Sequence, residues 1–419
     1  MPKLSQADNS RPKKSPILGC LGSLIRITGA LVTLILLGIW GFDLWYRMTS
    51  SSKPLSEHLH NQWADVRYMI WISQQGGAVV VDSDGSIKDL DGKKIPAKEV
   101  KNACLSRASA AAPSPEAWRS LNAGILLNQP TGYGITSLKI TPDGKTLISA
   151  GKQVEIWDLS TRTRLRTLSG QTVFVNAVAL SPDGKTIATG DNEGMISLWN
   201  FDTGQLQRRL SHGNKVYQLM FSSNGKILFS GGLNNTIKRW NVETENVDSL
   251  NTRFSVQKMA ITPDEKMVAV GSDQANAVQI LSVVTGEMVA MPIHGENVSA
   301  IAFNSTGRIL ASASGLRGGI RLWDMQHRPY MYQPIKTLKG HEGQPYAIAF
   351  SPDDRTLFAT ADGFRGRNYA VTVWNACTGE LVHRFGNQVR GLSIAISKDG
   401  KTLVTGGRKG DIQLWQLPK

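Results

Sequence analysis

Cysteine is scarce in this chain of 419 residues, which contains only Cys20, Cys104 and Cys377, far apart in the sequence. A disulfide scaffold is therefore excluded, and so is a local cysteine cluster that binds zinc. The sequence leaves open whether Cys104 and Cys377 pair with each other. Runs of consecutive Lys or Arg are also lacking, and no nucleic-acid-binding module is recognisable, so we expect no nucleic acid among the partners.

Motifs that carry chemistry are missing as well. A phosphate-binding loop needs a glycine five residues before its Gly-Lys-Thr, and the three Gly-Lys-Thr sequences, which begin at Gly144, Gly184 and Gly400, have Lys139, Ala179 and Ala395 there. No serine stands in a Gly-x-Ser-x-Gly elbow, and the pair His58 and His60 provides too few ligands for a metal site. The sequence predicts a protein that is not an enzyme and needs neither a metal nor a cofactor.

The composition has enough apolar residues for folding, with 41% hydrophobic and 19% charged residues. These values exclude global disorder and a polytopic membrane protein. A chain this long exceeds one ordinary core unless many small cores are stacked side by side. The formal net charge of +14 favours anionic partners without choosing among lipid, polysaccharide and acidic protein.

A membrane anchor is predicted near the N-terminus. Residues 27–46 are apolar except for Asp43, and a helix of this length spans about 30 Å, the thickness of a hydrocarbon core. Aromatic residues gather at its far end, and basic residues dominate residues 1–26. By the positive-inside rule we expect residues 1–26 in the cytoplasm, a single transmembrane helix over 27–46 and the rest of the chain outside, the alternative being a cytoplasmic location for that part.

One turn recurs seven times in the second part of the chain. Its clearest copy is Ser181-Pro182-Asp183-Gly184-Lys185, in which proline presets φ and glycine tolerates positive φ. The seven copies begin at Thr141, Ser181, Ser222, Thr262, Asn304, Ser351 and Ser397. Short alternating segments flank each copy, which predicts hairpins of β-strands.

A second landmark follows every turn. It is Trp157, Trp199, Trp240, Leu281, Trp323, Trp374 and Trp415, at steps of 42, 41, 41, 42, 51 and 41 residues. With this period and the Trp-Asp dipeptides at Trp157 and Trp323, the chain resembles the WD-repeat β-propeller family over residues 123–419. The resemblance implies an all-β fold with seven four-stranded blades.

The family's other signatures are sparse. The full Trp-Asp dipeptide occurs only at Trp157 and Trp323, and the Gly-His element occurs only at Gly340-His341. We therefore expect the buried polar network that these residues form in the family to be lost in most blades.

The propeller is expected to close with a strand from its own N-terminal side. The chain stops after a third strand at Trp415, so the seventh blade lacks its outer strand, and residues 124–128 align with that missing strand. Residues 47–122 are expected to form a stalk or a small accessory domain with a helix over 55–73, two short strands within 77–95 and a linker over 103–115.

The loops on one face of the propeller are the predicted binding site. WD-repeat proteins bind partners at loop entries, which here are Tyr133, Phe174, Lys215, Arg253 and Asn297. Blades five to seven add a cationic sector with two aromatic residues, which comprises Arg317, Tyr346, Phe364, Arg365, Arg367, Arg390, Arg408 and Lys409.

Taken together, these features predict a membrane-tethered, non-enzymatic scaffold that presents a basic binding face to protein partners with acidic surfaces. One alternative is a propeller that binds an anionic polysaccharide or a lipid headgroup. Another is an enzyme with its site at the central channel, which would need converging carboxylates or histidines on the inner strands.

Overall fold

The computed structural model describes residues 112–121, 124–128, 131–170, 173–315, 319–325, 334–341, 343–362, 369–387 and 391–417, with 362, 369–370 and 387 by backbone alone. It also describes the backbone of three strands nearer the N-terminus. The chain divides into two compact units, Met1–Ala97 and Lys98–Lys419. The predicted transmembrane helix at 27–46 lies outside the described residues. Within the described stretches, no helix is long and apolar enough to cross a membrane.

The first unit contains a three-stranded antiparallel sheet in the order β1-β2-β3, with β1 at Met69–Ile72, β2 at Ala78–Val81 and β3 at Ile87–Asp89. The two strands expected within 77–95 correspond to β2 and β3. The helix expected over 55–73 is wrong at its end, where β1 pairs with β2 from Met69↔Val81 to Ile72↔Ala78. Residues 69–72 are Met, Ile, Trp and Ile, a composition that favours a strand.

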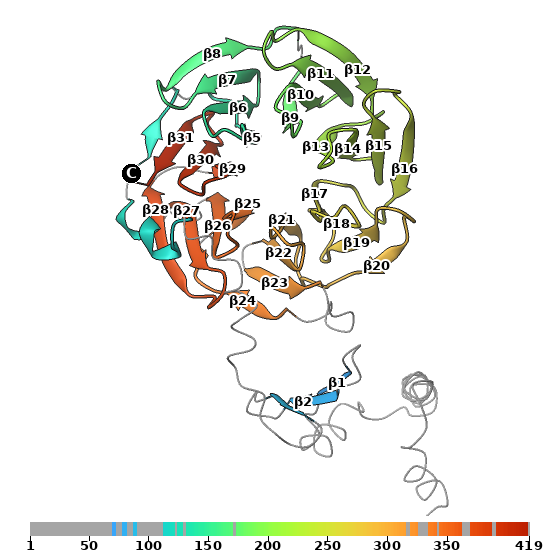
Figure 1. Cartoon of the computed structure of the whole chain (residues 1–419), viewed down its shortest axis with the longest axis vertical. Helices are drawn as coiled ribbons and strands as arrows, with labels where there is room; N and C mark the ends of the chain where they lie inside the picture. The colour runs from blue at the N-terminus through green and yellow to red at the C-terminus, as the bar shows by residue number, and fades with distance from the viewer. Residues whose placement is uncertain are drawn as a thin grey trace, which may run out of the picture. The chain divides into compact units, whose positions relative to one another are not determined.

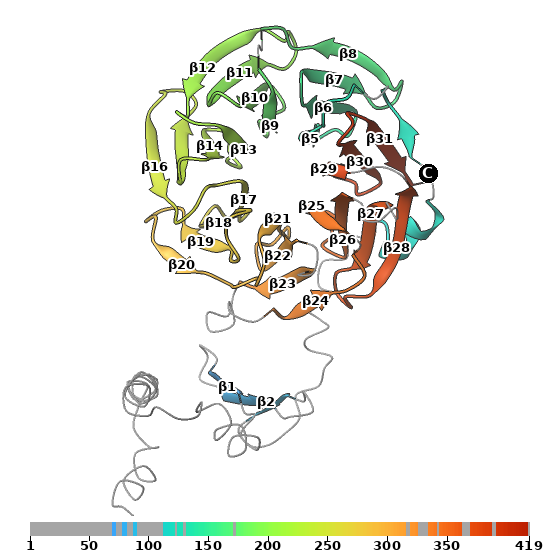
Figure 2. The same cartoon turned by 180° about the vertical axis from the view of Figure 1, so that it is seen from behind.

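The second unit is a seven-bladed β-propeller, seen along its axis in Figure 1 and from behind in Figure 2. In the described part of this unit, strands form seven four-stranded antiparallel sheets around a central opening. The first strand of each blade lies innermost and the fourth lies at the rim. The all-β fold and the number of blades expected from the turn and tryptophan periods are confirmed.

The strands follow one another in chain order in the first six blades. Blades one and two contain β5 (Ser137–Ile140), β6 (Thr146–Ala150), β7 (Val154–Asp158), β8 (Thr163–Thr167), β9 (Val175–Leu180), β10 (Thr186–Asp191), β11 (Met195–Asn200) and β12 (Leu206–Ser211). Blades three and four contain β13 (Val216–Phe221), β14 (Ile227–Gly232), β15 (Thr236–Asn241), β16 (Val247–Asn251), β17 (Lys258–Ile261), β18 (Met267–Gly271), β19 (Gln279–Ser282) and β20 (Met288–Ala290). Blades five and six contain β21 (Val298–Phe303), β22 (Ile309–Ser314), β23 (Ile320–Asp324), β24 (Lys336–Leu338), β25 (Gln344–Phe350), β26 (Thr356–Asp362), β27 (Tyr369–Asn375) and β28 (Leu381–Asn387). Blade seven contains β29 (Gly391–Ile396), β30 (Thr402–Gly407), β31 (Ile412–Gln416) and β4 (Ile125–Leu126).

The recurring turn joins the first two strands of each blade. In blade two, the Ser181 hydroxyl donates to the Asp183 carboxylate at 2.5 Å, and the same carboxylate accepts from the Lys185 amide at 3.0 Å. Gly184 adopts a φ of +73°, the conformation that the turn requires at this position. Charge-assisted hydrogen bonds of this kind favour ionised Asp183, and its pKa is lowered chiefly by the Ser181 hydrogen bond.

Blade seven is closed by β4, which comes from before blade one. Leu126 is opposite Gln413 and Ile125 is opposite Leu414, and these pairs place β4 beside β31. The Asn128 side chain extends the pairing because it donates to the Gly410 carbonyl at 2.7 Å and accepts from the Ile412 amide at 2.7 Å. The prediction that residues 124–128 supply the missing strand is confirmed, and the pairing removes an open sheet edge.

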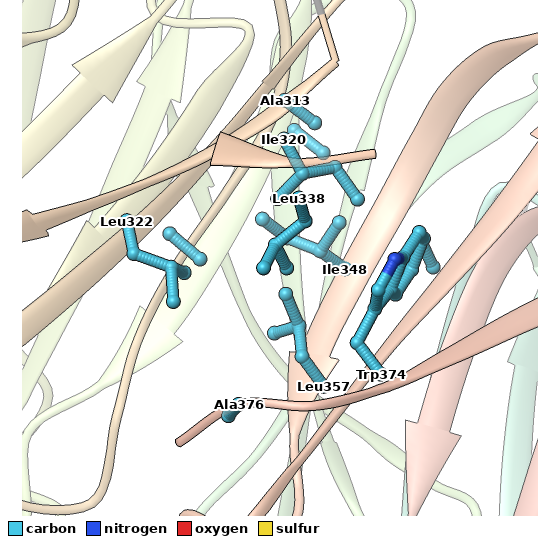
Figure 3. Close-up of a cluster of buried hydrophobic side chains, with 11 residues drawn as sticks. Ala313, Ile320, Leu322, Leu338, Ile348, Leu357, Trp374 and Ala376 are labelled. Atoms are coloured by element: carbon cyan, nitrogen blue, oxygen red, sulfur yellow. The ribbon is translucent and has the colours of Figure 1, made fainter. Parts of the chain in front are cut away.

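The core consists of apolar layers between neighbouring blades. Figure 3 shows one layer, in which Leu322 and Leu338 of blade five lie near Leu357 and Trp374 of blade six. Equivalent layers join other neighbours, and Leu281, which stands at the tryptophan position of blade four, is 1% exposed. Because each layer needs two blades, single blades are not independent folding units.

A short helix packs against the junction of blades six and seven. It is the 3-10 helix η1 (Pro115–Ser120), and its Trp118 is 1% exposed. The Trp118 ring meets Phe358 edge-on at 4.9 Å and stacks on Phe385 at 6.3 Å between centroids. His383 Nε2 donates to the Leu121 carbonyl at 2.9 Å. This part of the 47–122 region therefore contributes to the apolar core of the propeller.

Candidate binding face and central channel

Blade three contains a complete buried polar network. His212, which is 0% exposed, approaches Ser230 Oγ with Nδ1 at 2.9 Å and Asn234 Oδ1 with Nε2 at 2.8 Å. Trp240 Nε1 donates to Ser230 Oγ at 2.8 Å. If Asn234 accepts through Oδ1, His212 carries its proton on Nε2 and Ser230 donates to Nδ1, so every group is satisfied. The network ties the loop before β13 to β14 and β15.

Blade six contains the matching residue types without the network. Trp374 Nε1 donates to the Lys339 carbonyl at 2.9 Å instead of to Thr360 Oγ1. Within the described residues, neither ring nitrogen of His341 has a hydrogen-bond partner, and neither does Thr360 Oγ1. Burial lowers the pKa of His341 to about 4, and Arg384 acts in the same direction.

One half of this network, the hydrogen bond from a tryptophan to a Ser or Thr hydroxyl, occurs in more blades than expected. Trp157, Trp199, Trp323 and Trp415 each donate to a Ser or Thr hydroxyl on the preceding strand, at 3.0, 2.9, 2.7 and 3.2 Å. The expected loss therefore applies to the complete network, which blade three alone forms among the described residues, and not to this half. The sequence signal was the Ser or Thr that stands eight to eleven residues before each of these tryptophans, namely Ser149, Thr189, Ser312 and Thr405.

The propeller has two chemically different ends. Connections between the first and second and between the third and fourth strands of each blade form one end, which we call the turn face. Connections between the second and third strands and between blades form the other end, the loop face. All five predicted loop entries, Tyr133, Phe174, Lys215, Arg253 and Asn297, stand between successive blades and thus on the loop face.

Aromatic and cationic groups meet at the junction of blades seven and one on the loop face. Tyr133 is 47% exposed, and Lys152 Nζ lies 4.5 Å from the centroid of its ring. The Gly132 amide donates to the Lys409 carbonyl at 2.7 Å, which holds this segment against the loop that carries the exposed side chains of Arg408 and Lys409. We call Tyr133, Lys152, Arg408 and Lys409 the junction patch.

A buried carboxyl group lies beside the junction patch. Asp411 is 8% exposed, and burial raises its pKa although nearby Lys409 opposes the shift. Its Oδ2 has no hydrogen-bond partner among the described residues. Asp411 therefore contributes little negative charge to the surface of the junction patch.

The other predicted loop residues lie singly on other blades. Lys215 is half-buried, and its Nζ lies 5.7 Å from the ring centroid of Tyr217. The Arg253 amide donates to Gln279 Oε1 at 2.8 Å, and its side chain is exposed, as is that of Asn297. Phe174 is half-buried, and its carbonyl accepts from the Asn192 amide at 3.1 Å.

Much of the predicted cationic sector lies outside the described residues, namely Arg317, Phe364, Arg365, Arg367 and Arg390. Tyr346, expected in the cationic sector on the loop face, lines the central channel instead. Its carbonyl accepts from Lys258 Nζ at 3.2 Å.

The central channel contains two lysines that our sequence reasoning missed. Lys139 lies on β5 of blade one and Lys258 on β17 of blade four. The signal was their place in the repeat. Five other blades have Ala at the position of Lys139, two residues before the turn, and no other blade has a charged residue at the position of Lys258, four residues before it. Within the described residues, no group of three or more His, Cys, Asp or Glu side chains is arranged to hold a metal ion.

Comparison with known proteins identifies the repeat that builds the propeller. The WD40 family (WD domain, G-beta repeat) matches residues 162–200, 204–241, 288–324, 332–375 and 377–416. The chain therefore carries WD40 repeats, folded as a seven-bladed β-propeller.

Several curated proteins are similar to this chain over part of their length. Periodic tryptophan protein 2 homolog of Dictyostelium discoideum is 26% identical over 256 residues, which cover 58% of this chain and 27% of that protein. Protein groucho of Drosophila melanogaster is 26% identical over 209 residues, 48% of this chain and 28% of that protein. Apoptotic protease-activating factor 1 of Rattus norvegicus is 26% identical over 256 residues, 58% of this chain and 19% of that protein. The chain thus spans less than a third of the length of these relatives.

Proposed function

We propose that the protein is a non-enzymatic interaction scaffold whose loop face receives a protein partner with an acidic surface. The observation that carries this proposal is the junction patch, where an exposed tyrosine lies under a lysine and beside two further exposed cations. Aromatic and cationic side chains on a rigid support recur at binding interfaces because they offer contact area and charge at little entropic cost. The name of the relative Apoptotic protease-activating factor 1 describes action on another protein, which agrees with this class of function.

A paired charge reversal tests the proposal. Lys152→Glu with Lys409→Glu changes two exposed side chains of the junction patch, and should weaken retention of the partner about tenfold or more, because it replaces attraction with repulsion. The loss should shrink as ionic strength rises. The measurement is quantitative mass spectrometry of proteins retained by the purified full chain at several salt concentrations.

The matched control lies on the turn face. Lys226→Glu with Arg308→Glu reverses two exposed positive charges, as the junction-patch variant does. The turns that contain these residues have no Asp or Glu. Equal retention by the two double variants contradicts the proposal. Salt-sensitive retention of the wild-type chain and the turn-face variant, but not of the junction-patch variant, on an anionic polysaccharide or on anionic vesicles, with no protein partner found, favours the alternative binder.

We further propose that residues 27–46 tether the propeller to a membrane, with residues 1–26 in the cytoplasm and the propeller on the extracytoplasmic side. The apolar stretch, the aromatic residues at its far end and the preceding basic residues support this topology.

Thiol labelling of intact cells tests the topology. In a background with Cys104→Ser and Cys377→Ser, an impermeant reagent should label an exposed turn cysteine made by Ser223→Cys and should leave Cys20 unlabelled. Labelling of Cys20 alone would place the propeller in the cytoplasm, and recovery of the chain in the soluble fraction would contradict the tether.

A further inference from the structure

The central channel of the propeller is a polar cavity whose described lining bears only positive charge. Its volume is about 580 Å³, within the range of small-molecule sites. Lys139 and Lys258 are its charged lining residues, and no Asp or Glu lines it within the described part of the chain. Two ammonium groups that face one cavity without a counterion attract an anion.

The two lysines approach the cavity from opposite walls. Figures 1 and 2 show β5 and β17 on opposite sides of the central opening. Relative to the turns of their blades, Lys258 stands two residues nearer the loop face than Lys139, which is about 7 Å along a strand. An anion between them would therefore meet one ammonium group from each side at different depths.

Neither lysine forms an ion pair with a carboxylate among the described residues. The Lys258 ammonium group meets only a neutral acceptor among its described neighbours, the Tyr346 carbonyl of blade six. Lys139 is surrounded by the channel walls, yet its side chain is exposed to the water within them. Burial lowers the pKa of both lysines, that of Lys258 to about 8, so Lys258 remains mainly charged at neutral pH while lacking full hydration.

The rest of the lining offers hydrogen-bond donors. The innermost strand of each blade is a sheet edge, so some of its backbone N–H groups have no partner within the sheet. Thr136, Ser305 and Ser351 also line the cavity, but each of their hydroxyls already donates to a protein acceptor, so the backbone amides are the donors left to an anion. Backbone amides, hydroxyls and lysines are the groups that bind phosphate oxygens in proteins.

A purely structural role accounts for part of this arrangement. Side chains of neighbouring inner strands are linked to backbone carbonyls, as from Thr136 to Val175 at 2.9 Å and from Gln218 to Gln257 at 3.2 Å. Lys258 forms a similar link from blade four to blade six, where its ammonium group donates to the Tyr346 carbonyl. A neutral Gln or Thr suffices elsewhere for such a link, however, and the link gives no reason for a second lysine at position 139.

We infer that the central channel is a binding site for a small, multiply charged phosphate-bearing anion, held between Lys139 and Lys258. Phosphate groups combine close to two negative charges with several acceptor oxygens in a volume that the cavity holds. The site is independent of the junction patch and of any protein that binds there.

Calorimetric titration of the purified full chain with inorganic pyrophosphate tests the inference. We expect saturable binding at one site. Lys139→Met should weaken the affinity about tenfold or more, and so should Lys258→Met, because each removes one of the two charges. Lys258→Gln keeps a donor for the Tyr346 carbonyl without the charge, so it should preserve the melting temperature and still lose binding.

The control removes two exposed cations from the turn face, Lys226→Met with Arg308→Met, and should leave pyrophosphate affinity unchanged. Absence of saturable binding to the wild-type chain overturns the inference. So does equal affinity of the wild-type chain and a folded Lys139→Met/Lys258→Gln variant, which would show that the lysines serve only packing and solvation.

Discussion

Blades three and six contain the same types of polar residue at corresponding places, yet only blade three joins them. His212 contacts Ser230 and Asn234, whereas His341 has no hydrogen-bond partner within the described residues. The better match to the family's Gly-His element is Gly340-His341, in the blade without the network. A motif therefore places a residue type at a position, and the tertiary structure decides whether it is bonded.

Blade six has apolar support that blade three lacks. Trp118 of η1 packs on Phe358 and Phe385, and Phe385 in turn lies 4.8 Å from Trp415 of blade seven. Aromatic packing contributes beyond the area that it buries. The comparison teaches that the two blades are stabilised by different means, one by a directional polar network and the other by an added aromatic cluster.

Removal of that aromatic support should have the largest effect on stability. Trp118→Ala should lower the free energy of unfolding by about 3–5 kcal/mol, because it opens a cavity among fully packed side chains. Denaturant unfolding of the full chain measures the change. Tyr133→Ala, which removes a half-exposed aromatic ring, should cost about 0.5 kcal/mol or less; similar losses for the two variants would show that Trp118 is not a support of blade six.

Acid should destabilise blade six through His341. The folded-state pKa of about 4 lies below the ordinary value of 6.5, so the unfolded chain binds the proton first as pH falls. The stability linked to neutral His341 is present above pH 6.5 and is lost as pH falls toward 4, by about 3 kcal/mol.

The matching variant is His341→Phe, compared with the wild-type chain by denaturant unfolding between pH 7 and pH 4. The variant should lose about 3 kcal/mol less than the wild-type chain over this range. Parallel stability curves for the two chains would mean that His341 titrates normally.

Removal of the hydroxyl group on the second strand should destabilise blade three more than blade six. Ser230→Ala removes the acceptor of Trp240 and the partner of His212, and should cost about 2 kcal/mol because buried polar groups lose their partners. Thr360→Val removes a hydroxyl that bonds nothing in the described structure, and should change stability by less than about 1 kcal/mol. The reverse order in denaturant unfolding would contradict the assignment of the network to blade three.

The smallest expected effect concerns the fourth member of the blade three network. Asn234→Asp places a carboxylate at His212 Nε2, which should raise the pKa of His212 from the value that burial now lowers. Stability at pH 7 should change by about 1 kcal/mol or less, since the gain in attraction is offset by desolvation. Titration of the His212 ring by NMR measures the shift, and an unchanged pKa would show that position 234 does not face the imidazole.

The repeating part of the structure was predictable from sequence. Turns such as 181–185 have a local mechanism in which a serine hydroxyl, an aspartate and a glycine act within five residues. The closing strand followed from counting strands in the last repeat, and Asn128 and Ile412 confirm its place. The predicted loop entries stand between successive blades because the order of strands defines that place, and their role in binding stays a prediction.

Features that join distant residues were not predictable. Trp118 meets Phe385, and Lys258 reaches Tyr346 across two blades. No periodic signal marks Trp118, which precedes the repeats, and the sequence alone favoured a helix where β1 pairs with β2.

The sequence by itself determined the seven blades and their turns, because these depend on backbone preferences and apolar periodicity within about 40 residues, and the closing strand followed from the count of strands in the last repeat. Only the tertiary structure decided which histidines are bonded, which tryptophan supports blade six and which lysines face each other in the channel. The physical reason is the separation along the chain of the residues that interact. Turn chemistry acts within five residues, whereas the hydrogen bonds of His212 join separate segments of one blade, and the aromatic contacts and the shared cavity bring side chains of different segments or blades within a few ångströms.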